Sequence, residues 1–256
     1  MNKLSLSGTV WVASDIHLGE ETPKTARAFY RFLESACDQA DALILCGDIF
    51  DAWIGDDHAQ TDPPDWLAEA LTQFRQTASR IPLWIGRGNR DFLMGPDLAE
   101  LLGARLLPDR VVLSTAAGDM LLSHGDEYCT DDLAYQRFRR IVRTAWVQKA
   151  FLGLGLPTRR RIAAWARRRS KAGRAGKSMH IMDANPKAVI DALRKAGCDT
   201  AIHGHTHRPA TQTLQTPGGP VTRIVLPDWD YEHEPARAGW LSLDAQGAHL
   251  IQDTRF

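Results

Sequence analysis

The chain has 256 residues, of which 44% are hydrophobic, so it can form one large domain or two small ones with a sizeable core. Its 31 Lys and Arg residues balance 31 Asp and Glu residues, and this zero net charge argues against a general nucleic-acid-binding protein. The N-terminus lacks the pattern of a signal peptide, no apolar run is long enough to span a membrane, and the four cysteines form no CxxC pair, so we expect free thiols in a soluble cytosolic protein that can still meet a membrane surface.

Short apolar segments alternate with amphipathic ones through most of the chain. Strands are expected at residues 9–13, 42–46, 82–85, 111–113, 120–122 and 200–202. Helices are expected from Pro23, with Thr22 as the N-cap, and at 65–79 and 186–195. This alternation predicts the βαβ units of an α/β protein. From residue 211 onward, β-prone segments at 222–226 and 240–243 predict an antiparallel sheet.

Polar clusters follow the ends of five predicted strands. They are Asp15-Ile16-His17, Gly47-Asp48, Gly88-Asn89-Arg90-Asp91, Ser123-His124-Gly125 and Gly204-His205-Thr206-His207. Each is weak alone, because Asp-x-His is common in surface loops and Gly-Asp is a common turn pair. Ligands bind beyond the carboxyl ends of strands in open α/β sheets, so the five segments could converge on one site.

Histidines are concentrated at the last of these strand ends. His203, His205 and His207 fall within five residues, and Gly204 is expected to turn the chain so that a loop displays the imidazoles. Imidazole is the commonest nitrogen ligand for transition metals. The alternative is a set of unrelated surface or core histidines, and these residues alone do not complete a metal site.

Taken in order, the five clusters resemble the signature of the calcineurin-like metallophosphoesterases, and the resemblance covers the whole chain. It implies a four-layer α/β/β/α sandwich of two mixed sheets, formed by residues 1–256 as a single domain. It also implies two metal ions in one site, with Asp48 as the catalytic carboxylate that bridges them. One ion is expected to take Asp15, His17, Asp48 and His207, and the other Asp48, Asn89, His124 and His205.

These residue types suit a dimetal hydrolase. Two divalent ions ~4 Å apart can clamp the attacking and leaving oxygens of an in-line displacement and acidify a shared water. Mixed oxygen and nitrogen ligands without thiolate suit Mn²⁺, Fe²⁺ or Zn²⁺ and are poor for Ca²⁺. The neighbouring Asp91 and Asp126 could orient ligand histidines, or they could be turn and capping residues.

Arg90 indicates the type of bond that is cleaved. Many phosphatases that the chain resembles have histidine at this position, where it can protonate an alkoxide leaving group. Arginine keeps its proton, so it is a poor general acid, but it binds phosphate well and stabilises negative charge in a transition state. A departing phosphate monoester needs no proton, so Arg90 favours cleavage of a pyrophosphate linkage. The alternative is a neutral replacement on a tolerant loop.

The segment from residue 137 to residue 177 contains fourteen Lys or Arg residues and no Asp or Glu. Apolar residues recur at helical spacing from Tyr135 to Trp146, and an apolar run follows from Phe151 to Pro157. Basic residues interleaved with Trp, Leu and Phe predict a helical surface that meets anionic lipid. A solvated helical hairpin and a nucleic-acid-binding surface are the alternatives, although the apolar run suits acyl chains better.

The motifs around these clusters narrow the resemblance. Segments 49–57, 124–132, 170–172, 177–179 and 202–209 are similar to the UDP-2,3-diacylglucosamine diphosphatases of lipid A biosynthesis. This implies two Mn²⁺ per chain, and attack at the phosphorus next to uridine to release UMP and 2,3-diacylglucosamine 1-phosphate (lipid X). It also implies a helical lid at residues 132–177 that receives the acyl chains, and a peripheral position on the cytoplasmic face of the inner membrane.

By the same resemblance, seven residues are expected to contact the lipid-linked nucleotide sugar. They are Asn89, Arg90, Asp132, Ser170, Arg174, Lys177 and His205. Arg174 stands where the family often has asparagine, although a cation there could still meet phosphate. For Asp132 and Ser170 the alternative is helix capping.

Two other functions remain open at this point. A dimetal enzyme could act on a nucleotide diester or a phosphoprotein, but the basic and apolar lid argues against both. A non-catalytic scaffold would be expected to lose ligands, whereas all seven are present. We expect an anionic membrane surface as a partner, and neither nucleic acid nor an obligate protein partner.

Overall fold

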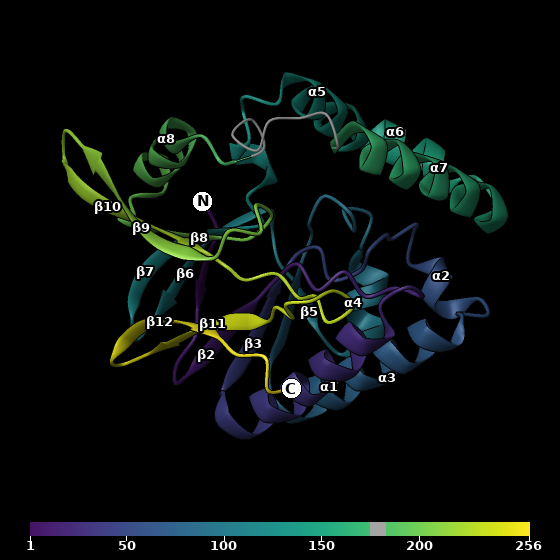
Figure 1. The fold of residues 1–256 in the computed structure, drawn as a ribbon, viewed down its shortest axis with the longest axis horizontal. Helices are drawn as coiled ribbons and strands as arrows, with labels where there is room; N and C mark the ends of the chain where they lie inside the picture. The colour runs from purple at the N-terminus through teal and green to yellow at the C-terminus, as the bar shows by residue number, and fades with distance from the viewer. Residues whose placement is uncertain (175–182) are drawn as a thin grey trace.

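The computed structural model describes residues 1–174 and 183–256, which form two six-stranded mixed sheets (Figure 1). The first sheet has the strand order β1 (Lys3–Ser5), β6 (Arg110–Thr115), β7 (Gly118–Ser123), β8 (Thr200–His203), β10 (Gly219–Val225) and β9 (Ala210–Thr216). The second has the order β12 (Gly247–Gln252), β11 (Gly239–Asp244), β2 (Val10–Ala13), β3 (Ala42–Cys46), β4 (Leu83–Gly86) and β5 (Arg105–Leu106).

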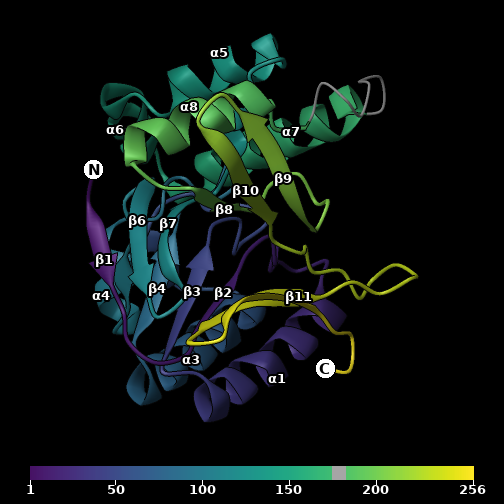
Figure 2. The ribbon, with the colours of Figure 1, turned by 90° about the vertical axis from the view of Figure 1, so that its left-hand side faces the viewer.

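Helices cover the outer face of each sheet (Figure 2). The helices α1 (Pro23–Gln39), α3 (Asp65–Arg80) and α4 (Pro96–Leu102) pack on the second sheet, and α8 (Pro186–Ala196) packs on the first. The inner faces of the sheets meet through a separate apolar cluster that includes Val12, Ile44 and Leu122. The predicted four-layer α/β/β/α sandwich of two mixed sheets is therefore confirmed.

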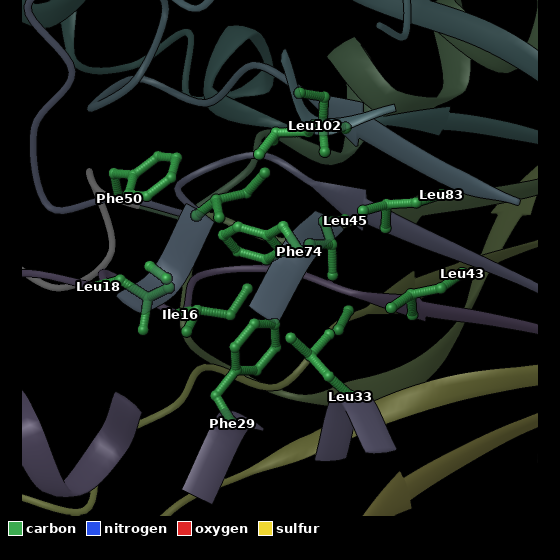
Figure 3. Packing of buried hydrophobic residues seen from close by; sticks show 14 of the residues in the cluster. Ile16, Leu18, Phe29, Leu33, Leu43, Leu45, Phe50, Phe74, Leu83 and Leu102 are labelled. Carbon is green, nitrogen blue, oxygen red and sulfur yellow. The ribbon is translucent and has the colours of Figure 1, made fainter. Parts of the chain in front are cut away.

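Strand β3 shows how the sequence produces this layering. All five of its residues are buried, and successive side chains of a strand point to opposite faces. Leu43 and Leu45 therefore pack on the helical side, near Phe74 of α3 (Figure 3), while Ile44 faces the other sheet. Strand β3 carries no polar side chain, and Asp48 follows two residues beyond its end.

The C-terminal strands depart from the prediction of one antiparallel sheet. Strands β9 and β10 form a hairpin at the edge of the first sheet, and β11 and β12 form a hairpin at the edge of the second. Strand β10 also pairs in parallel with β8, whereas β11 pairs antiparallel with β2. The hairpins are local features, but the sheet that each one joins is decided by distant strands.

Three helices lie beside the loops at one end of the sheets. They are α5 (Leu133–Val142), α6 (Ala145–Leu152) and α7 (Leu156–Arg174), and we call them the lid (Figure 1). Arg143, which directly follows α5, donates to the Gly88 carbonyl, and the buried Arg159 of α7 donates to the Ile54 carbonyl and pairs with Asp57. Within the described part of the chain, no helix is both long and apolar enough to cross a membrane.

Candidate metal centre

The loops that follow β2, β3, β4, β7 and β8 carry all the predicted ligand residues. Six of these residues fall into two groups, in each of which the ligand atoms lie within 4.8 Å of one another. The first group comprises Asp15, His17 and His207, and the second comprises Asp48, His124 and His205. Residues that are distant in the sequence therefore meet at the carboxyl ends of strands, where an α/β sheet places ligand sites.

The first group is built around a buried carboxylate. Oδ2 of Asp15 accepts hydrogen bonds from the Ser14 hydroxyl and the His205 backbone N–H, which leaves Oδ1 directed at the histidines. Oδ1 lies 3.4 Å from Nε2 of His207, and that nitrogen lies 3.5 Å from Nε2 of His17. Oδ1 of Asp15 and Nδ1 of His17 are buried and make no hydrogen bond within the described residues.

Asp48 lies between the two groups. Its Oδ1 is 3.6 Å from Nε2 of His124, whereas its Oδ2 is 3.8 Å from Nδ1 of His17. Oδ1 of Asn89 lies 3.2 Å from the same nitrogen of His124, which places the amide beside the second group. One carboxylate thus presents one oxygen to each group.

The backbone at the candidate ligands adopts an uncommon conformation. Six non-glycine residues in the described part of the chain have positive φ, and five of them are the candidate ligands Asp15, His17, Asp48, His205 and His207. Positive φ is unfavourable for residues with a Cβ and occurs mostly where the surrounding structure enforces it at functional sites. These backbone conformations reduce the stability of the fold, and they direct the ligand side chains into the site.

Two glycines allow the loops to approach closely. A Cβ on Gly204 would lie 2.1 Å from Oδ2 of Asp15, and a Cβ on Gly88 would lie 2.1 Å from Oδ1 of Asp48. We expected Gly204 to turn the chain, but the positive φ belongs to His205 and His207 instead. Gly204 is required for space rather than for a turn.

Burial and nearby charges shift the titration of the cluster. Burial, only partly offset by His124, raises the pKa of Asp48 to about 7. Burial lowers the pKa of His205 to about 3. For His207 burial is outweighed by Asp15 and Asp228, which raise its pKa to about 10. Carboxylates and imidazoles share this buried space, and Oδ1 of Asp15 and Nδ1 of His17 make no hydrogen bond within the described residues, an arrangement that fits divalent cations.

Two acceptors hold ligand histidines by their second ring nitrogen. Oδ2 of Asp228 lies 3.2 Å from Nδ1 of His207, and the Cys46 carbonyl lies 3.1 Å from Nδ1 of His124. The sequence analysis missed Asp228. The available signal was its position, because it follows the end of a strand as the candidate ligands do.

For Asp91 and Asp126, orientation of ligand histidines was one of two expected roles, but both residues make other contacts. Asp91 accepts backbone N–H groups of Gly88 at 2.6 Å and Ile49 at 2.7 Å, so it joins the loops after β3 and β4. Asp126 accepts the Tyr135 hydroxyl at 2.6 Å and Nε of Arg139 at 2.7 Å, so it joins the lid to the loop after β7. Asp91 thus matches the loop-stabilising alternative.

His203 is separated in role from the other two histidines of its segment. It is fully buried, and its Nε2 accepts a hydrogen bond from Nε of Arg223 at 2.9 Å. Burial and the charge of Arg223 lower its pKa to about 4, so it stays neutral. Of the three clustered histidines, His203 matches the core alternative, whereas His205 and His207 lie in the metal groups.

The structure describes some of the predicted substrate-contacting residues and leaves others outside its described part. The Arg90 backbone N–H donates to Oδ1 of Asp48 at 2.8 Å, so Arg90 lies next to the metal groups. Asp132 caps α5 by accepting the Tyr135 N–H at 3.0 Å, as its capping alternative predicted. Ser170 and Arg174 belong to α7, but their side chains lie outside the described part, and Lys177 lies outside the described residues altogether.

Comparisons with known proteins match this geometry. The family model of calcineurin-like phosphoesterases matches residues 8–209. A protein named UDP-2,3-diacylglucosamine hydrolase from Bordetella parapertussis is 55% identical over 257 residues, which cover 99% of both chains. A protein of the same name from Klebsiella pneumoniae is 44% identical and covers 88% of this chain and 92% of its own.

Proposed function

The chain belongs to the calcineurin-like phosphoesterase family, and from this membership we propose that it hydrolyses UDP-2,3-diacylglucosamine at the pyrophosphate bond. Hydrolases of that name are 55% and 44% identical to this chain over 99% and 88% of its length, which supports this substrate. The observation that carries the chemistry is the position of Asp48, with one oxygen toward each of two ligand groups and Arg90 bound to it. A site of this form can hold two cations and one phosphate between them.

The seven candidate ligands are proposed to hold two Mn²⁺ per chain. Carboxylate, amide and imidazole donors without thiolate fit Mn²⁺, and the buried atoms of Asp15 and His17 that make no hydrogen bond within the described residues support cations at this position. When bound, the two cations would neutralise phosphate oxygens and acidify a water molecule. Asp48 would hold both cations at a fixed separation, and Asn89 and His205 would adjoin the phosphate as well as the metal.

Arg90 fits cleavage of a pyrophosphate linkage, and we propose that attack occurs at the phosphorus next to uridine. A water oxygen bonds to that phosphorus, and the bond to the bridging oxygen breaks. The products are then UMP and 2,3-diacylglucosamine 1-phosphate, or lipid X. The leaving group is a phosphate monoester that needs no proton. Arg90 would therefore act by binding and stabilising negative charge, which a guanidinium does without losing a proton.

The lid is proposed to receive the acyl chains and to meet the membrane. Nine large hydrophobic side chains are exposed among the described residues, and eight of them lie on the lid or on the connection between α6 and α7: Leu133, Phe138, Ile141, Trp146, Leu152, Leu154, Ile162 and Trp165. Trp146 is 72% exposed. Apolar side chains with basic neighbours favour an anionic lipid surface, which agrees with a peripheral position on the cytoplasmic face of the inner membrane. Residues 132–177 would thus act as an insertion within one domain.

Hydrolysis of UDP-2,3-diacylglucosamine beside its deacylated analogue, with and without Mn²⁺, tests the proposal. We expect turnover that requires added Mn²⁺, is abolished by a chelator and prefers the diacylated substrate. In water labelled with oxygen-18, the label should enter UMP. Label in the lipid product would place the attack at the other phosphorus. Equal turnover of both substrates would mean that the enzyme does not recognise the acyl chains.

A further inference from the structure

One carboxylate on the loop after β3 binds two arginines from different parts of the chain. Oδ1 of Asp51 lies 2.6 Å from Nη1 of Arg90, and its Oδ2 lies 2.6 Å from Nη1 of Arg167. Arg90 follows β4 beside the metal groups, whereas Arg167 belongs to the lid helix α7. Asp51 therefore joins the candidate phosphate-binding arginine to the lid.

Asp51 is itself held in place by the loop after β2. Its backbone N–H donates to the Leu18 carbonyl at 2.9 Å, and Phe50 pairs with Leu18 in an isolated bridge. A short side chain on a fixed backbone has few rotamers, whereas an arginine has many. The Arg90 backbone is fixed by Asp48 and by donation from the Trp53 N–H to its carbonyl, so the free part of Arg90 is its long side chain.

We infer that Asp51 is a positioning residue for Arg90, which fixes the guanidinium toward the phosphate and couples its position to the docking of α7. The inference rests on the proposed function, because it assigns Arg90 to phosphate. Short charge-assisted hydrogen bonds impose direction as well as attraction. A misplacement of a catalytic group by about 1 Å can cost about 10²-fold in rate, so a residue that fixes Arg90 affects turnover without touching substrate.

A second pair on the same lid helix provides a matched comparison. Arg159 of α7 pairs with Asp57, which also lies on the segment after β3. Both pairs tether α7 to the body of the protein, but Asp51 also binds Arg90. Loss of Asp57 therefore removes a lid contact while the partner of Arg90 remains.

The test is a double-mutant cycle on the Mn²⁺-loaded enzyme. We would measure kcat and KM for UDP-2,3-diacylglucosamine and for bis(4-nitrophenyl) phosphate, a small soluble diester that does not need the lid. The variants are Asp51→Ala, Asp51→Asn, Asp51→Glu, Arg90→Ala, the Asp51→Ala/Arg90→Ala double variant and the control Asp57→Ala. Asp51→Asn keeps the shape of the side chain and covers the case in which Asp51→Ala does not fold.

We expect both Asp51 variants to lower kcat about 10- to 100-fold on both substrates, with bound Mn²⁺ unchanged. In the Arg90→Ala background, Asp51→Ala should add less than about twofold, because a positioning residue acts only through its partner. Asp57→Ala should leave kcat on the soluble diester within about twofold of wild type. Asp51→Glu should recover part of the lost rate.

Additive losses in the cycle would overturn the inference, since Asp51 would then act independently of Arg90. An equal loss in Asp57→Ala would also overturn it, because lid tethering alone would explain the effect. A failure of the proposed function would give a different result from a failure of this inference. If wild type hydrolyses the soluble diester but not the nucleotide sugar, the substrate is wrong, and the cycle on the diester still decides the role of Asp51.

Discussion

Asp228 and Asp15 contact opposite nitrogens of the His207 ring. Oδ2 of Asp228 is 3.2 Å from Nδ1, and Oδ1 of Asp15 is 3.4 Å from Nε2. Arg237 in turn donates to Oδ2 of Asp228 at 3.1 Å, so the orienting carboxylate is itself fixed. A carboxylate on the outer nitrogen sets the tautomer of a ligand histidine and raises its basicity.

Asp228→Asn should weaken metal binding without removing a proposed ligand. The loss of an orienting carboxylate typically costs 10- to 100-fold in metal affinity, and we expect about that change here. The free Mn²⁺ in a titration of the metal-stripped protein can be followed by electron paramagnetic resonance. Activity at saturating Mn²⁺ should recover largely. A variant that binds Mn²⁺ as tightly as wild type would show that Asp228 does not tune the site.

Sequence patterns predicted the sheet, the strand ends and the clusters at those ends, because these depend on short local signals. Strand β3 is apolar throughout, and Asp48 follows two residues after it. The partner of His207 was not predictable in this way. Asp228 is distant from His207 in sequence and forms no motif with it, so only the return of the chain after β10 brings them together.

The backbone conformation at the site also could not be predicted from the sequence. Positive φ at Asp15 and Asp48 is imposed by the surrounding loops and contradicts local preference. The lid gives a further example, since the sequence predicted its helices and its excess of basic residues. It could not predict that Arg159 and Arg167 have carboxylate partners on the body, and these pairs reduce the self-repulsion that the sequence alone suggests.

Asp48→Asn should abolish turnover while the fold survives. The amide keeps the shape of the side chain but removes the negative charge that two cations would share, and the loss of one member of a catalytic cluster costs orders of magnitude in rate. Circular dichroism should match wild type, while Mn²⁺-dependent hydrolysis should fall by about 10³-fold or more. A folded variant with near-normal activity would contradict the bridging role.

Arg90→Ala should lower kcat by about 10²-fold, the scale seen when one donor to a transition-state oxyanion is removed. Arg90→Lys should recover only part of this rate, because the planar fork of the guanidinium is lost. The informative quantity is the ratio of kcat in Arg90→Lys to kcat in Arg90→Ala. Full activity in Arg90→Lys would mean that a point charge is sufficient at this position.

Asp183→Asn should lower the free energy of unfolding at neutral pH and change how that free energy depends on pH in acid. Burial raises the pKa of Asp183, but the hydrogen bond from Arg223 outweighs it, so the pKa lies below the usual 3.8. A depressed pKa means that this stabilisation is fully present above about pH 4 and is lost as the pH falls through the folded pKa. Asp183 is partly exposed and water screens the contact, so we expect a loss of about 1 kcal/mol at pH 7.

Urea unfolding of the metal-free protein at pH 7 and pH 3 measures this effect. The difference in unfolding free energy between wild type and Asp183→Asn should shrink at the lower pH, because the Asp183 carboxylate of the unfolded chain, with a pKa near the usual 3.8, is then largely protonated. A difference that is equal at both values would mean that the charge of Asp183 contributes nothing to the contact with Arg223.

The last prediction concerns the role of the lid in substrate selection. Fourteen cations and no acidic residue occupy residues 137–177, and exposed apolar side chains lie among them. Leu152 is 40% exposed at the end of α6, and Phe151 is its neighbour. An acyl chain can cover such side chains, and each buried CH₂ group contributes about 0.8 kcal/mol. The metal groups have no part in this contact.

Changing Phe151 and Leu152 together to Ser should therefore raise KM for the diacylated substrate by about 10-fold or more, since each loses apolar contact with hydrocarbon. Hydrolysis of a small soluble diester should remain nearly unaltered, because it needs only the metal groups and Arg90. The decisive quantity is the ratio of kcat/KM for the two substrates in wild type and in the double variant. A fall in this ratio assigns acyl recognition to the lid. An unchanged ratio would mean that the lid does not recognise the acyl chains.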